Sequence, residues 1–113
     1  MMIFGRKKEW KKIAGSEGEI RDLDKGVGTA ELDGKKICVA SFGGRLHAFS
    51  YLCPHAGGPL IDGEINARGD IICPVHGYHF NIRNGYNSSG EGFKLSCWPV
   101  EVREDGVYLE TRE

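Results

Sequence analysis

Short apolar segments separated by glycine-containing turns run through almost the whole chain. The dipeptides Asp33-Gly34, Gly43-Gly44, Asn84-Gly85 and Asp105-Gly106 combine residues that tolerate positive φ angles, as tight β-hairpins require. Between these turns the apolar residues alternate or come in short runs, which favours strands over amphipathic helices. The sequence therefore predicts an all-β fold, a small antiparallel sandwich or barrel.

Several segments have the length and composition of β-strands, and the chain of 113 residues offers room for one hydrophobic core. We therefore expect a single domain over residues 1–113. The expected strands are Trp10–Ala14, Thr29–Leu32, Lys36–Phe42, Arg45–Ser50, Gly63–Asn66, Asp70–Cys73, His79–Ile82, Phe93–Val100, Glu101–Arg103 and Val107–Thr111.

The charge balance and the N-terminus exclude several classes of partner. A formal net charge of −1, from 15 Lys and Arg against 16 Asp and Glu, gives no global basic field for nucleic acid. The first residues contain too few apolar side chains for a signal peptide or a membrane span, so a cytoplasmic location is expected. In that reducing setting, the four cysteines and nearby histidines favour metal binding over disulfides.

Two loops interrupt the alternation and concentrate Cys, His, Pro and Gly. The first contains Cys53 and His55 in a CxH pattern, and the second contains Cys73 and His76 in a CxxH pattern. Two thiols and two imidazoles suit either a zinc ion or an iron–sulfur cluster. Common zinc sites place two cysteines on one loop and two histidines on another, whereas each loop here is mixed. If the loops converge, the cysteines can hold one iron and the histidines a second.

The two loops resemble the signature of the Rieske [2Fe-2S] family, CxHxG followed by CPxHGxxF. The matching residues are Cys53, His55, Gly57, Cys73, Pro74, His76, Gly77 and Phe80. The resemblance implies a Rieske-type antiparallel fold with a cluster-binding subdomain formed by the two loops, and one [2Fe-2S] cluster. It also implies that Cys53 and Cys73 bind the buried iron, while His55 and His76 bind the outer iron.

Departures from the family's high-potential members bear on the reduction potential. Those members carry a disulfide between the loops, whereas the matching positions here are Gly58 and Val75. They also place hydroxyl donors to the cluster sulfurs where this chain has Tyr78 and Phe80. Such hydrogen bonds stabilise the reduced cluster, so their loss lowers the potential. We expect a value nearer about −150 mV than about +300 mV.

The remaining cysteines and histidines receive structural interpretations. Cys38 and Cys97 lie in apolar strand segments and are interpreted as small buried residues. His47 is expected to be solvated or hydrogen-bonded, and His79 to lie at the surface, with tuning of the cluster or contact with a partner as its alternatives. The basic run over residues 6–12 is interpreted as a solvated terminus that could steer an acidic partner.

The resemblance implies a soluble Rieske-type ferredoxin that carries one electron from a reductase to a terminal oxidoreductase, such as a ring-hydroxylating dioxygenase. It would bind no small-molecule substrate and would not itself be an enzyme, since only His47 and His79 remain for a further iron site. The small subunit of an assimilatory nitrite reductase is the alternative. A zinc-stabilised interaction module and a redox-sensing regulator are hypotheses from other functional classes.

Overall fold

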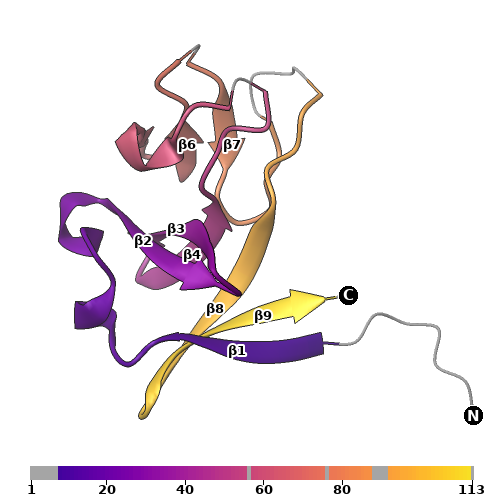
Figure 1. Ribbon diagram of the computed structural model, residues 1–113. Coiled ribbons are helices and arrows are strands. Elements are labelled where there is room, and N and C mark those ends of the chain that lie inside the picture. The colour runs from indigo at the N-terminus through magenta and orange to yellow at the C-terminus, as the bar shows by residue number, and fades with distance from the viewer. Residues whose placement is uncertain (1–7, 56, 76, 88–91, 113) are drawn as a thin grey trace, which may run out of the picture.

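A computed structural model describes residues 8–55, 57–75, 77–87 and 92–112, which form two antiparallel sheets (Figure 1). The larger sheet has the strand order β1-β9-β8-β4-β3-β2, and the smaller has the order β5-β6-β7. The bounds are β1 Lys8–Ala14, β2 Val27–Leu32, β3 Lys35–Phe42, β4 Arg45–Ser50, β5 Glu64–Ile65, β6 Asp70–Ile72, β7 His79–Asn81, β8 Cys97–Arg103 and β9 Gly106–Arg112. The all-β prediction is confirmed.

Three of the four predicted turn dipeptides lie between neighbouring strands of the larger sheet, whereas Asn84-Gly85 lies between β7 and β8, which belong to different sheets. Asp33 and Gly34 both have positive φ angles, 53° and 83°, and join β2 to β3. Gly43 and Gly44, at 64° and 78°, join β3 to β4. Two successive residues with positive φ give the turn whose twist matches that of paired strands. These turns fix the register of the β2–β3 and β3–β4 pairs.

The C-terminal strands differ from the prediction in one respect. Residues 93–96 precede β8 instead of belonging to it, and the two segments predicted as separate strands form one continuous strand. Leu95 is buried, and its amide donates to the carbonyl of Gly85. This segment therefore bonds to the turn at Gly85 instead of to a neighbouring strand. Strand β8 then pairs with β4 over its first residues and with β9 over the rest.

Three short 3-10 helices were not expected from the periodicity, which carries no signal over three residues. They span Glu17–Glu19, Leu23–Lys25 and Leu60–Asp62. In the described part of the chain no helix is long and apolar enough to cross a membrane.

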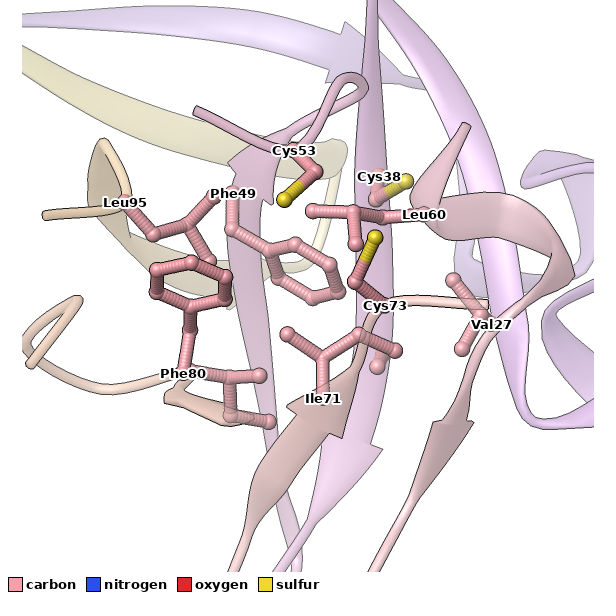
Figure 2. Close-up of a cluster of buried hydrophobic side chains, with 11 residues drawn as sticks. Val27, Cys38, Phe49, Cys53, Leu60, Ile71, Cys73, Phe80 and Leu95 are labelled. Carbon is pink, nitrogen blue, oxygen red and sulfur yellow. The ribbon is translucent and has the colours of Figure 1, made fainter. Parts of the chain in front are cut away.

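Strands β3 and β4 are covered on both faces, which divides the buried residues into two clusters. Along β3, Ile37 and Val39 face one cluster while Cys38 and Ala40 face the other. The first cluster includes residues of β9 such as Val107, and the second includes residues of the smaller sheet such as Ile71. A strand buried on both faces is apolar throughout instead of alternating. The second cluster, drawn in Figure 2, carries the candidate site.

His47 supports the β3–β4 hairpin through its side chain, as one of its predicted roles required. Its Nε2 lies 3.3 Å from the carbonyl oxygen of Phe42. Partial burial lowers the pKa of His47 below its usual range, and the positive charges of Arg83 and Arg45 lower it further, against the opposing effect of the Phe42 hydrogen bond. The folded protein therefore favours the neutral imidazole.

We expect His47 to make the fold less stable as the solution becomes acidic. Its folded-state pKa lies below the unfolded value of about 6.5, so the unfolded chain binds more protons in that window. This contribution to stability is present above about pH 6.5 and is lost as pH falls towards the folded pKa. Denaturant unfolding of His47→Gln should show a smaller loss than the unaltered protein between about pH 7 and about pH 5.5. Parallel stability curves would contradict this assignment.

Candidate metal centre

The first loop is a closed hairpin that begins at Cys53. Leu52 pairs with Pro59 at its base. Above this bridge the Cys53 amide donates to the carbonyl of Gly58, and the Cys53 carbonyl accepts from the amide of Gly57, both at 2.9 Å. Gly57 has a φ of 70°, a conformation in which glycine meets no steric penalty. The backbone of Cys53 is therefore held on both sides.

The second loop repeats this hairpin with the same hydrogen bonds. Ile72 pairs with His79 at the base. The Cys73 amide donates to the carbonyl of Tyr78, and the Cys73 carbonyl accepts from the amide of Gly77, again both at 2.9 Å. Gly77 has a φ of 72°. The two cysteines therefore occupy equivalent positions in two loops with the same backbone hydrogen bonds.

Both cysteine side chains lie in the core beneath the loops. Cys53 is 3% exposed and Cys73 is 1% exposed. Figure 2 shows both sulfur atoms beside the side chain of Leu60, which is fully buried in the same cluster. Two thiols from separate loops thus meet in one apolar environment, as the prediction of converging loops requires.

The loops also contact each other where the high-potential family members carry a disulfide. A Cβ built on Gly58 would run into the Cγ2 atom of Val75 and would lie 3.5 Å from the Sγ of Cys73. Glycine suits this position because the side chain of Val75 in the second loop approaches its backbone closely. The loops are joined by van der Waals contact at this point.

His55 is half-buried, and its Nδ1 atom is removed from solvent. Its imidazole stacks on the ring of Tyr78, with centroids 4.1 Å apart and planes inclined by 25°. Phe93 lies against it at 5.0 Å and 59°. Sequence reasoning did not find this stacking, because the contact joins different loops. His76, the fourth predicted ligand, lies outside the described residues.

The donor set suits a two-iron cluster. A two-iron cluster with mixed ligands needs only a pair of protein ligands on each iron. The buried pair, Cys53 and Cys73, supplies soft thiolate donors of the kind that iron–sulfur clusters use.

The two other cysteines pack in or against the same cluster of buried residues. Burial raises the pKa of Cys38 to about 12. Burial likewise raises the pKa of Cys97 to about 12, and the charge of Lys94 opposes the rise. Both thiols stay protonated at neutral pH, and a thiol must lose its proton to bind metal. Cys38 is fully buried as predicted, whereas Cys97 is only partly buried.

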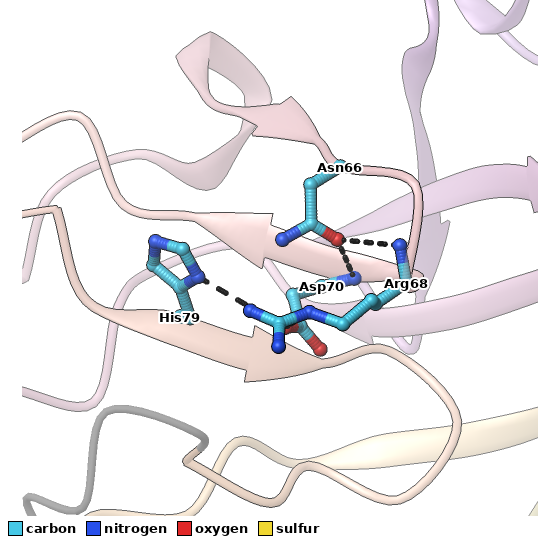
Figure 3. A network of polar contacts seen from close by, with 4 residues as sticks. All are labelled: Asn66, Arg68, Asp70 and His79. Atoms are coloured by element: carbon cyan, nitrogen blue, oxygen red, sulfur yellow. Dashed lines mark hydrogen bonds and ion pairs between the residues drawn. The ribbon is translucent and has the colours of Figure 1, made fainter.

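His79 is half-buried at the base of the second loop, not simply exposed as the first interpretation proposed. Its Nδ1 lies 3.9 Å from a carboxylate oxygen of the buried Asp70, which is also 3.9 Å from the Nε of Arg68. The side chain of Asn66 accepts hydrogen bonds from the amides of Arg68 and Asp70 (Figure 3). These contacts hold the turn between β5 and β6 in place, and His79 lies beside them.

The sequence profile of the Rieske [2Fe-2S] domain matches residues 10–99 of this chain. The chain belongs to the Rieske [2Fe-2S] family. A Rieske domain holds one [2Fe-2S] cluster, and this is the cofactor of the chain. The matched region includes both loops and the strands that carry them.

Several relatives share the Rieske domain in proteins of different size. Apoptosis-inducing factor 3 of Homo sapiens is 34% identical over 80% of this chain, which spans only 15% of that protein. The ferredoxin component of the alkene monooxygenase system of Xanthobacter autotrophicus is 26% identical over 67% of this chain and 62% of its own. A nitrite reductase of Emericella nidulans is 26% identical over 66% of this chain and 8% of its own. The chain thus spans less than two thirds of these relatives.

Two solved structures share the fold over nearly their full length. The ferredoxin of carbazole 1,9a-dioxygenase from Nocardioides aromaticivorans is 22% identical, with a TM-score of 0.71, over 88% of this chain and 95% of its own. A chain in a complex of reduced oxygenase and oxidized ferredoxin in carbazole 1,9a-dioxygenase is 25% identical. Its TM-score is 0.70, over 88% of this chain and 91% of its own. Both support the fold described above.

We expect Gly58→Ala to disturb the contact between the loops. The added methyl group would press on Val75 close to Cys73, and overpacking of this kind costs about 1–3 kcal/mol. The unfolding free energy and the iron content of the purified protein should both fall. Gly18→Ala is the matched control, since the nearest atom to its Cβ would be the Ser16 hydroxyl at 3.8 Å. Equal unfolding free energy and iron content in the two variants would contradict the importance of this contact between the loops.

Proposed function

We propose that Cys53 and Cys73 bind the inner iron of the cluster and that His55 and His76 bind the outer iron. The support for the inner pair is the burial of both thiols beneath two equivalent loops. The support for His55 is that it is only half-buried and turns its Nδ1 edge into the protein. The assignment of His76 rests on its place in the sequence motif.

The chain acts in this proposal as a one-electron carrier. When bound, the cluster supplies one reversible electron at a potential set by its ligands and surroundings. The observation that carries the proposal is the asymmetry of the site, with thiols in the core and the imidazole of His55 towards the surface. The buried thiols keep the inner side apart from water, and the histidine side leaves a short path to a partner.

The proposed partners are a ferredoxin reductase and a terminal oxygenase. Support comes from relatives that are ferredoxin components of oxygenase systems and from the complex of an oxygenase with a ferredoxin. The exposed apolar side chains of Leu52, Val75 and Phe93, on or near the two loops, offer contact area to such a protein. The resemblance to a nitrite reductase supports a role as its small subunit as the second candidate.

The chain carries electrons in this proposal and performs no catalysis on a substrate. A mononuclear iron site of the oxygenase type needs two histidines and a carboxylate with open positions. Apart from the two proposed ligands, the chain has only His47 and His79. His47 contacts the β3–β4 turn and His79 lies in β7 beside Asp70, so each has a separate structural setting.

The free thiols Cys38 and Cys97 fit the reducing cytoplasm that we propose as its location.

Removing a proposed ligand should prevent assembly of the cluster. We expect Cys53→Ser and His55→Ala, produced anaerobically with iron and sulfide supplied, to lose iron, acid-labile sulfide and the visible absorption bands. His79→Ala should keep all three, because His79 contacts Asp70 in the smaller sheet. A native spectrum in His55→Ala would overturn the ligand assignment. A colourless unaltered protein that contains zinc would favour the zinc-stabilised interaction module instead.

The carrier role should appear as sustained electron flow. The protein is mixed with NADPH, a reductase and a terminal oxygenase or nitrite reductase encoded beside its gene, and product formation is measured. We expect many turnovers for each molecule of this protein and none with Cys53→Ser, which lacks the proposed inner-iron ligand. A cluster-containing protein that supports no turnover with any of these enzymes would favour a redox-sensing role.

A further inference from the structure

The contact between His55 and Tyr78 joins the two loops through their side chains. His55 belongs to the first loop, whereas Tyr78 follows Gly77 at the end of the second. A centroid distance of 4.1 Å and an inclination of 25° describe a nearly parallel stack, which stabilises the pair of rings. Phe93 adds a tilted ring. Two aromatic rings therefore lie against the imidazole.

The position of Tyr78 is itself fixed by the backbone of the second loop. Its carbonyl accepts the amide of Cys73, and the next residue, His79, begins β7. The Tyr78 ring is partly buried and packs against the cluster of buried residues that contains both cysteines. A ring anchored in this way can hold a neighbouring imidazole in one orientation.

We propose that Tyr78 is a positioning residue that holds His55 in its ligand orientation and keeps the reduction potential low by excluding water from the imidazole. The proposal rests on the ligand role of His55 proposed above. It concerns the ring of Tyr78 and assigns no part to its hydroxyl group.

The sign of the effect follows from the charges of the site. Two ferric ions are balanced by two sulfides and two thiolates, so the oxidised site is neutral and the reduced site carries one negative charge. Water stabilises a charged state more than a neutral one. Replacing this ring by an aliphatic side chain therefore raises the potential.

The test compares Tyr78→Leu and Tyr78→Phe with the unaltered protein by redox titration and by the iron–imidazole vibrations in resonance Raman spectra. Tyr86→Leu is the matched control, since it makes the same chemical change at a tyrosine that is 68% exposed and outside the stack. We expect Tyr78→Leu to favour reduction by about threefold and to shift the iron–imidazole bands. Threefold is about 28 mV at 59 mV per tenfold for one electron. Tyr78→Phe and Tyr86→Leu should match the unaltered protein.

An unchanged potential and unchanged bands in Tyr78→Leu, with iron and sulfide present, would overturn the proposal and leave the ligand assignment intact. An equal shift in Tyr78→Phe would also overturn it by assigning the effect to the hydroxyl. Should Tyr78→Leu fail to hold iron, Tyr78→Met replaces it as a ringless side chain of similar length. Loss of iron from both, with retention in Tyr78→Phe, would support the ring as the positioning element. Native iron–imidazole bands in His55→Ala would instead contradict the assignment of His55 as an iron ligand.

Discussion

Each loop of the metal centre is closed by two hydrogen bonds to the backbone of the cysteine that begins it, and the site depends on this closure. Because the amide and carbonyl of Cys53 and Cys73 are both used within their loops, each thiol is directed into the core without leaving buried backbone groups unsatisfied. The glycines at 57 and 77 make the closure possible, since each turn needs a positive φ. The Rieske signature is therefore as much a backbone requirement as a ligand list.

Much of the fold was predictable from the sequence because its information is local. Turn dipeptides such as Asp33-Gly34 force a hairpin through their own φ preferences, and the strands on either side inherit the register. The start of β8 was not predictable, because residues 93–96 have strand-like composition. What diverts them is a hydrogen bond from Leu95 to Gly85 and the burial of Leu95, both of which depend on a distant turn.

The metal centre, too, was predictable from the sequence only in part. The spacing of Cys53, His55 and Cys73 indicated a metal centre because metal ligands must be supplied in particular types and numbers. The stack of His55 on Tyr78 and the contact of Gly58 with Val75 carry no such signal. Each joins residues of different loops, so no local pattern in the sequence indicates it. The half-burial of His79 likewise follows from the placing of Asp70 in β6.

Strand β8 belongs to both halves of the larger sheet, since it pairs first with β4 and then with β9. Its early residue Cys97 packs beside the site, while Trp98 and Val100 pack in the other cluster. Opening one half of the molecule would strip hydrogen bonds from a strand that the other half shares. The domain is thus expected to open as one cooperative unit. Destabilisation of the two cysteine loops should consequently increase hydrogen exchange at amides of the β8–β9 hairpin, which lies outside those loops.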